Sequence, residues 1–264
     1  MKVVRIKVLR LNCMLIFSIF NAMTYCLAIQ LNQGLVFASD TRTNAGADYI
    51  SSYRKMHIFT PSDDRLLVIL SAGNLATTQE VLDRVQRDIT TPGVESLSTV
   101  NHLFEAATYL GRVSVDVQQR HAQALQQSGV NGEVSMILGG QIRGEAEGIC
   151  LIYPQGNYIM ASVETPYLQI GESKYGKPML DRVINNRLSL EGGARLALIS
   201  LDATIRSNVS VGPPFDLAIY PANSFHLSRQ ERFEFDSPYY VSLRQSWQNG
   251  LSNAFLGLPR FDWE

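Results

Sequence analysis

Cysteine and histidine are scarce in this chain of 264 residues. Its three cysteines, Cys13, Cys26 and Cys150, do not suggest a disulfide framework and fit a reducing compartment. Its four histidines have no metal-ligand spacing, and the HExxH pattern of zinc peptidases does not occur. These counts predict a cytoplasmic protein that binds no metal.

The chain also has no excess of basic residues that would indicate a nucleic-acid partner. Its net charge is −1, and the first 22 residues contribute four positive charges and no negative one. Without that segment the net charge is −5. The segment continues with mostly apolar residues at 11–20, as in a signal peptide, and it is too short to span a membrane.

The extension at residues 1–22 has three possible origins. Cleavage after Ala22 would place bulky Phe20 where small residues are preferred, which argues against export. We interpret the extension as the result of a wrongly chosen start codon, with a leader or a propeptide as alternatives. With 45% hydrophobic and 18% charged residues and no internal repeat, the chain is expected to form one domain over residues 23–264.

Residues 24–29 combine a threonine with the alternating pattern of a half-buried strand. Threonine is a poor nucleophile inside a chain because no base normally lies beside its hydroxyl. At a free N-terminus its own α-amine, with a pKa near ~8, can serve as that base. Removal of Met23 would expose Thr24 in this way. Cys26 shares the strand face with Thr24, and we interpret it as a small buried hydrophobic residue.

Short apolar runs and amphipathic stretches alternate along the rest of the chain. We expect strands at residues 34–39, 55–59, 66–70, 134–142, 149–153, 157–163, 217–220 and 232–235. Helical periodicity predicts helices at 75–89, 99–128, 175–188, 191–207 and 241–249. Pairs of strands thus alternate with pairs of helices. This order predicts an α+β fold, a four-layer αββα sandwich in which two antiparallel sheets lie between helix layers.

Three residues follow Thr24 in an order that carries a family resemblance. Asp40 ends the second strand, Lys55 begins the third, and Gly73 lies at a strand-to-helix junction. This order resembles proteasome β-subunits and the wider group of N-terminal nucleophile (Ntn) hydrolases. The span from residue 23 to about 244 is most similar to Anbu, the bacterial ancestral β-subunit type. The phrases that carry the match are FASDTRTNAG at 37–46 and IGESKYGKP at 170–178.

The resemblance implies a role for each of these residues. Thr24 would attack a peptide carbonyl while its amine takes the hydroxyl proton. Lys55 would keep that amine unprotonated by like-charge repulsion, and Asp40 would neutralise and orient Lys55. The N–H of Gly73 would stabilise the oxyanion.

Further family positions match only in part. Ser173 is a candidate for the serine that supports the threonine amine, although Glu172 aligns with the usual serine. In the later Arg-Asp-x-x-Ser pattern, Arg206 and Ser210 match, but Ser207 replaces the aspartate.

The resemblance also places three residues at the substrate cleft. Thr43, Asn44 and Leu75 lie beside the expected oxyanion donor Gly73 in the family pattern and would contact substrate. Thr77 departs from the pattern because an aspartate is common at its position. The side chain that the cleft accepts cannot be derived from these residues.

Residues 171–177 also fit the first seven places of the phosphate-binding pattern GxxxxGK[ST]. The next residue is Pro178, so the hydroxyl that binds Mg²⁺ is missing. We therefore expect no nucleotide and no other cofactor.

Two classes of function remain open. The chain is expected to be a proteasome-type threonine endopeptidase that acts on peptides or unfolded proteins inside a homo-oligomeric ring or short spiral. The alternative is an assembly subunit with little proteolysis, or an Ntn amidohydrolase acting on a different amide. No membrane or nucleic-acid partner is expected, and no residue indicates an ATPase partner.

Overall fold

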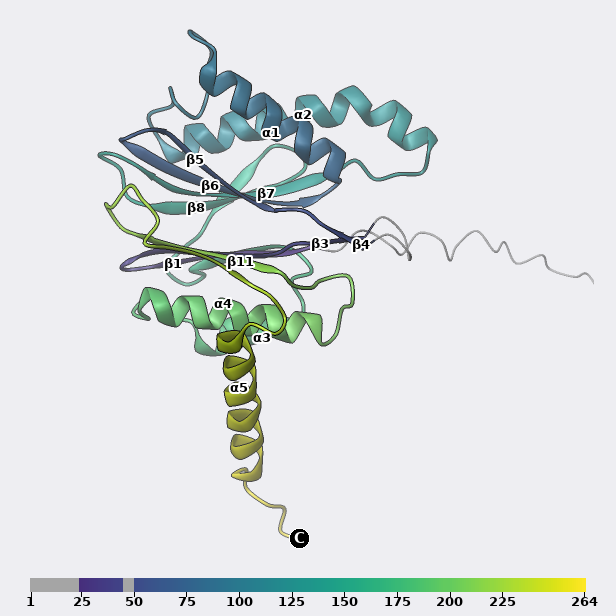
Figure 1. Ribbon diagram of the computed structural model, residues 1–264, viewed down its shortest axis with the longest axis vertical. Coiled ribbons are helices and arrows are strands. Elements are labelled where there is room, and N and C mark those ends of the chain that lie inside the picture. Colours follow the sequence, from purple (N-terminus) through teal and green to yellow (C-terminus); the bar gives the residue numbers. More distant parts are fainter. Residues whose placement is uncertain (1–23, 45–49) are drawn as a thin grey trace, which may run out of the picture.

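The computed structural model describes residues 24–44 and 50–264, so the extension expected at 1–22 lies outside the described residues. Two five-stranded antiparallel sheets face each other at the centre of the molecule. Helices α1 and α2 cover the outer face of one sheet, and α3 and α4 cover the outer face of the other (Figure 1). The predicted αββα sandwich is therefore confirmed.

The first sheet has the strand order β10-β1-β2-β11-β12. Its strands are β1 (Tyr25–Leu31), β2 (Gly34–Asp40), β10 (Tyr167–Gly171), β11 (Phe215–Pro221) and β12 (Arg229–Phe233). A tight turn at Asn32 and Gln33 joins β1 to β2. Strands β1 and β2 are almost entirely buried, because the second sheet covers one of their faces and α4 the other.

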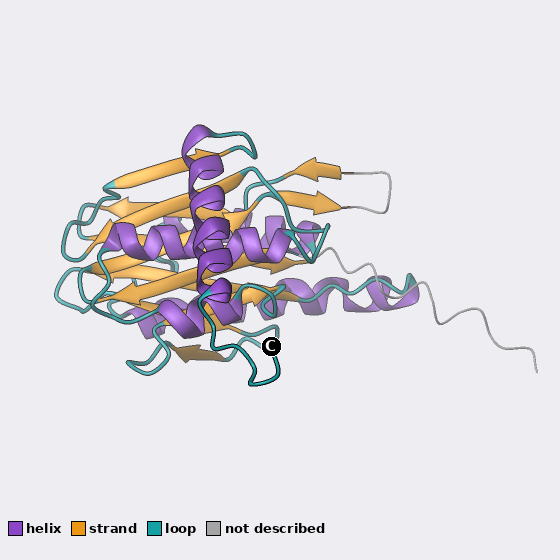
Figure 2. Ribbon diagram, turned by 90° about the horizontal axis from the view of Figure 1, so that it is seen from below, coloured by secondary structure: helices purple, strands orange, loops and turns teal. Residues whose placement is uncertain are grey.

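The second sheet has the strand order β5-β6-β7-β8-β9. Its strands are β5 (Met56–Ser62), β6 (Arg65–Gly73), β7 (Val134–Ile142), β8 (Gly148–Ile152) and β9 (Tyr158–Met160). Two short strands, β3 (Arg42–Asn44) and β4 (Ile50–Ser52), pair as a separate ribbon that extends beyond the sheets (Figure 2). The chain thus leaves Asp40 at the end of β2 and returns to the second sheet at Lys55.

Five helices complete the described elements. They are α1 (Leu75–Thr90), α2 (Leu103–Gln127), α3 (Lys177–Val183), α4 (Leu190–Ile205) and α5 (Pro238–Leu256). The Asn74 side chain caps α1 by accepting a hydrogen bond from the Thr77 N–H at 3.1 Å. The Ser189 hydroxyl caps α4 in the same way. Such caps satisfy backbone donors that a helix start leaves without partners.

The alternation predicted for residues 24–29 decides where their side chains pack. Cys26 and Ala28 belong to the apolar cluster between the two sheets. Tyr25, Leu27 and Ile29 belong to the cluster between the first sheet and α4. Because both faces of β1 are packed, the position of its first residue is fixed by the core.

Helix α5 stands away from the four layers (Figure 1). Tyr240 anchors its first turn, where it is fully buried against the edge of the Phe215 ring. From residue 248 to residue 264 every residue is exposed. Among the described residues, no helix is both long enough and apolar enough to cross a bilayer.

Several element boundaries differ from the sequence prediction. Helix α2 begins at Leu103 instead of residue 99, because the Ser96 N–H is bound by the Thr99 hydroxyl in a preceding turn. Helix α3 ends at Val183, and the Asn185 side chain turns the chain by binding the Arg187 N–H. Helix α5 is longer than the predicted 241–249, and β9 is shorter than 157–163. Strand β10 and the β3–β4 ribbon were not among the predicted strand ranges.

Candidate active site

Thr24 lies immediately before β1, and only 6% of its surface is exposed. Its carbonyl oxygen accepts a hydrogen bond of 2.7 Å from the Glu172 N–H. Gly171, the residue before Glu172, ends β10 with φ of +82°, a conformation that favours glycine. A Cβ atom on Gly171 would lie 1.8 Å from the Thr24 carbonyl oxygen. The end of β10 therefore holds Thr24 by a contact that only glycine permits.

Asp40, the last residue of β2, is fully buried and accepts three hydrogen bonds. Its Oδ1 accepts from the Tyr25 N–H at 3.0 Å and from Lys55 Nζ at 2.7 Å. Its Oδ2 accepts from the Gly212 N–H at 3.2 Å. Burial raises the pKa of the Asp40 carboxyl, and Lys55 and the two backbone N–H groups oppose that rise.

Lys55 is 6% exposed and lies just before β5. Its ammonium also donates to the Arg42 carbonyl at 2.5 Å. Lys55 Nζ and the Tyr25 N–H nitrogen share one oxygen of Asp40, so the two atoms are less than about 6 Å apart. The structure therefore brings the predicted pair Asp40 and Lys55 together beside Thr24.

Gly73 lies at the same end of the sandwich. It is the last residue of β6, is exposed and has φ of +120°. Ser71 connects this end of β6 to the site, because its N–H donates to the Lys55 carbonyl at 3.0 Å. The Ser71 carbonyl lies 3.6 Å from the Cys26 sulfur, which joins β6 to β1 two residues from Thr24. Burial raises the pKa of the Cys26 thiol, as expected for a buried apolar residue.

The three predicted substrate-contacting residues lie on elements next to this site. Leu75 is the first residue of α1, two residues after Gly73, and it is partly exposed. Thr43 lies on β3 and is also partly exposed. Asn44 ends β3, but its side chain lies outside the described part of the chain.

The two predicted serines lie in loops that flank Glu172. Ser173 is partly buried, and its carbonyl oxygen accepts from the Lys177 N–H at the start of α3. Ser210 lies between α4 and β11 and is partly buried, with its N–H bound to the Asn208 side chain at 2.9 Å. Glu172 itself is buried, with 6% of its surface exposed.

Three contributors to the site have no signal in the sequence. The backbone N–H groups of Tyr25, Glu172 and Gly212 hold Asp40 or Thr24, and any residue except proline supplies such a group. Their part in the site depends on which strands pair and where the loop before β11 returns. The side chain of Asn208 was also missed, because Asn208 is not part of the motif that places Ser210.

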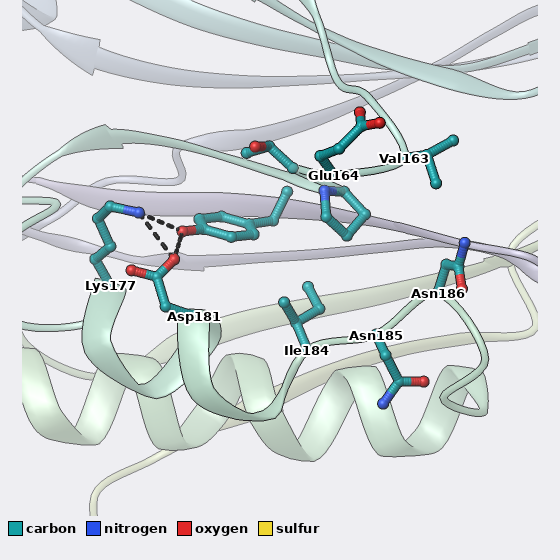
Figure 3. Close-up of a pocket in the computed structure, with 10 residues that line it drawn as sticks. Val163, Glu164, Lys177, Asp181, Ile184, Asn185 and Asn186 are labelled. Carbon is teal, nitrogen blue, oxygen red and sulfur yellow. Dashed lines mark hydrogen bonds and ion pairs between the residues drawn. The ribbon is translucent and has the colours of Figure 1, made fainter.

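A separate cavity of about 340 Å³ lies between β10 and α3 (Figure 3). On its wall, Lys177 donates to Asp181 at 2.8 Å and to the Tyr167 hydroxyl at 2.7 Å, and Tyr167 donates to Asp181. Asp181 and Tyr167 raise the pKa of Lys177, and Lys177 and Tyr167 lower that of Asp181. Tyr167 pairs with Ile29, which is five positions from Thr24, so this wall of the cavity lies about 16 Å from Thr24 along the strand. It is not part of the Thr24 site.

Among the described residues, no three histidine, cysteine or acidic side chains are arranged to hold a metal ion.

Comparison with known proteins places this site in a family. The sequence model of the proteasome subunit family matches residues 21–220, and the chain belongs to that family. An Anbu (ancestral β-subunit) structure from Yersinia bercovieri is 46% identical, with a TM-score of 0.85, over 91% of this chain and 100% of its own. Within the proteasome family, the chain is thus of the Anbu type.

Two further solved Anbu structures are also similar to this chain. An Anbu Gly-1 mutant from Hyphomicrobium sp. strain MC1 is 40% identical, with a TM-score of 0.84, over 90% of this chain and 99% of its own. A helical assembly of the Anbu complex from Pseudomonas aeruginosa is 44% identical, with a TM-score of 0.85, over 90% and 98%. No curated protein matches the chain.

Proposed function

We propose that the protein is a proteasome-type threonine endopeptidase in which Thr24 is the N-terminal nucleophile. The observation that carries the proposal is the shared oxygen of Asp40, which binds Lys55 and the N–H of the residue after Thr24. A buried lysine and a buried aspartate in this geometry hold a positive charge next to the place where a free Thr24 amine would lie. Membership of the proteasome family supports the same chemistry.

The proposed reaction proceeds in two steps. Thr24 Oγ attacks the peptide carbonyl, and the Thr24 amine, directly or through water, takes the hydroxyl proton. The C–N bond of the substrate then breaks, the leaving amine receives that proton, and an ester to Thr24 remains. Water hydrolyses the ester and restores the free hydroxyl. The N–H of Gly73 stabilises the negatively charged oxygen in both steps.

The buried ion pair has a specific task in this mechanism. The positive charge of Lys55 disfavours a second positive charge on the Thr24 amine, so it lowers the pKa of that amine and keeps it available as a base. Asp40 prevents the buried lysine charge from standing alone. Ser173, next to Glu172, and Ser210, in the loop that Glu172 contacts through Asn208, would support the Thr24 amine.

The proposed substrate is a peptide or an unfolded protein. Thr43 and Asn44 on β3 and Leu75 at the start of α1 would border the cleft on either side of Gly73. An extended segment could bind between these elements, with its reacting carbonyl near Gly73. We include no cofactor, since the site residues supply nucleophile, base and oxyanion donor.

A second candidate is a proteasome-like subunit with little proteolysis, or an amidohydrolase that acts on another amide. The observation that favours it is the buried carboxylate of Glu172 beside Thr24, where the family pattern has serine. Ser207 likewise replaces an expected aspartate. Measured activity on peptides decides between the two candidates.

We also propose that the protein assembles from identical copies, head to tail, into a ring or a short spiral. The related protein from Pseudomonas aeruginosa forms a helical assembly. In this chain, α5 projects from the body (Figure 1). It and the residues after it carry large exposed apolar side chains. They are Tyr239, Val241, Leu251, Phe255 and Leu256 on the helix and Leu258, Phe261 and Trp263 after it. A surface of this kind indicates contact with another chain.

The nucleophile is tested by covalent labelling. Thr24→Ala should abolish labelling by a peptide epoxyketone, a threonine-directed electrophile, and should leave the thermal unfolding temperature within a few degrees. Thr165→Ala, a change to an exposed threonine near the other end of β10, should label like the unchanged protein. Intact-mass measurement should show a mature chain that begins at Thr24. Undiminished labelling of the Thr24→Ala protein would refute the assignment.

A further inference from the structure

The loop between α4 and β11 is fastened to the candidate active site at three points. The Asn208 side-chain amide donates to Glu172 Oε2 at 3.1 Å. The Arg42 guanidinium donates to the Val209 carbonyl at 2.9 Å. The Gly212 N–H donates to Asp40 Oδ2 at 3.2 Å. Ser210 lies between these points, so its position depends on them.

Glu172 contacts both sides of this arrangement. Its backbone N–H donates to the Thr24 carbonyl at 2.7 Å, and its carboxylate accepts from Asn208 and from the Lys174 N–H at 3.2 Å. The Asn208 side-chain oxygen accepts in turn from the Ser210 N–H at 2.9 Å. A continuous chain of hydrogen bonds therefore runs from Thr24 through Glu172 and Asn208 to Ser210.

We propose that Glu172 and Asn208 are positioning residues that fix Thr24 and Ser210 relative to each other and thereby set the rate of acylation of Thr24. We call this pair the Glu172–Asn208 clamp. The inference rests on the proposed function for its effect on rate, but not for its effect on the loop. Neither residue acts on substrate; each acts through the residue that it holds.

The chemistry of the two side chains fits this task. An amide is the side-chain group that can donate at one end and accept at the other, as Asn208 does between Glu172 and Ser210. A carboxylate acceptor strengthens the donated bond relative to a neutral acceptor. The length of a glutamate side chain also reaches a loop 36 residues away in sequence, which a serine at the same position would not reach. Glu172, which departs from the family pattern, is thus joined to Asn208, the residue after the other departure, Ser207.

The decisive single change is Asn208→Asp. It keeps the oxygen that accepts from Ser210, removes the donor to Glu172 and sets two carboxylates against each other. The maximum rate of epoxyketone labelling should fall about tenfold or more, because small displacements of a nucleophile are costly. The inhibitor concentration for half-maximal rate should change less than twofold. The pH profile of labelling should move to higher pH, because an added negative charge near the Thr24 amine raises its pKa.

The double change Glu172→Gln with Asn208→Asp supplies the matched control. The glutamine amide then donates to the aspartate, while its oxygen still accepts from Lys174 and the aspartate still accepts from Ser210. The hydrogen bonds that join residue 172 to Lys174 and to residue 208, and residue 208 to Ser210, are restored with one reversed in direction, and the number of charges is unchanged. The labelling rate should return to within about threefold of the unchanged protein.

Amide hydrogen exchange of residues 208–212 gives a readout that does not need activity. Exchange should be faster in Asn208→Asp and in Asn208→Ala, and it should return to the original rate in the double variant. Wild-type protein that is not labelled at Thr24 would overturn the proposed function while leaving this readout valid. Unchanged exchange and labelling in Asn208→Asp, or a folded double variant no better than Asn208→Asp, would overturn the clamp. If Asn208→Asp does not fold, the same comparison is made between Asn208→Ala and the double variant.

Discussion

Replacing Lys55 by methionine should show how much burial increases the contribution of the Asp40–Lys55 pair to the free energy of unfolding. The two side chains are 2.7 Å apart, with 8% and 0% of their surfaces exposed. Methionine keeps the length of the side chain but removes the charge. Removing one partner of a buried pair leaves an uncompensated charge, which typically costs about 3–5 kcal/mol. For a domain of this size, that cost corresponds to a decrease in Tm of roughly 6–20 °C.

The chain contains a matched control in Lys177→Met. Lys177 pairs with Asp181 at 2.8 Å, nearly the same distance, but these side chains are 52% and 48% exposed. Exposed pairs contribute about 0–1 kcal/mol because water and salt screen them. Lys177→Met should therefore lower the free energy of unfolding by no more than about 1 kcal/mol. The difference between the two variants isolates the effect of burial.

The cost of Lys55→Met should depend on pH in a defined direction. Burial already raises the pKa of Asp40 from its reference of 3.8, and the loss of Lys55 removes the main opposing influence. A folded-state pKa above the unfolded value means that protonation favours the folded state. The stabilisation from protonation is complete below about pH 3.8 and is lost as the pH rises through the folded-state pKa. The deficit of the variant should thus be largest at neutral pH and shrink as the pH falls.

Urea or thermal unfolding of both variants between pH 5 and pH 8, at one protein concentration, measures these effects. A second variant, Lys55→Met with Asp40→Asn, should recover part of the loss because no buried charge remains. If Lys55→Met costs no more than Lys177→Met at neutral pH, the buried pair does not stabilise the fold as its geometry indicates. A deficit that grows as the pH falls would contradict the sign of the Asp40 shift.

Two other predictions test the neighbourhood of Thr24 and the assembly. Gly171→Ala should slow labelling of Thr24 and destabilise the fold by about 1–3 kcal/mol or more, because the added Cβ would meet the Thr24 carbonyl. The control is Gly144→Ala, at a glycine with φ of +93° and open space around it, which should show only the cost of the backbone strain. Serine at both Leu251 and Phe255, one turn apart on α5, should reduce the mass measured by light scattering, while changing polar residues of α5 to serine should not. Wild-type protein that is monomeric at micromolar concentration would refute the assembly proposal.

Most of the fold can be predicted from the sequence because the helices and most strands show a local hydrophobic periodicity. Hydrophobic spacing marks α1 and α4, and alternation marks β1, whose two faces enter two different clusters. Strand β10 is different. It is five residues long, and its importance lies in its pairing with β1, which brings Gly171 against Thr24. Pairing between strands more than 100 residues apart leaves no local pattern, so the contact that holds Thr24 could not be derived from periodicity.

The residues of the candidate site likewise differ in whether the sequence alone could predict them. Asp40 and Lys55 were predicted because their order after Thr24 resembles that of proteasome β-subunits, and the structure joins them. The Gly212 N–H that binds the other oxygen of Asp40 comes from a loop 172 residues away. Backbone donors carry no identity in the sequence, and their place follows only from the tertiary path. The catalytic roles of Thr24, Gly73, Ser173 and Ser210 stay predictions.

Asp40 makes the position of the start of β1 and the charge of Lys55 depend on each other. One of its oxygens binds both the ammonium of Lys55 and the backbone N–H of Tyr25, so a change in the charge of Lys55 alters the acceptor that orients the start of β1. Its other oxygen binds Gly212 and so holds the loop of Ser210. In the proposed mechanism, tuning of the Thr24 amine and placement of Thr24 thus share one carboxylate. Variants of Lys55 should therefore disturb both the pH profile and the maximum rate of labelling, whereas a lysine that acted only through charge would shift the profile alone.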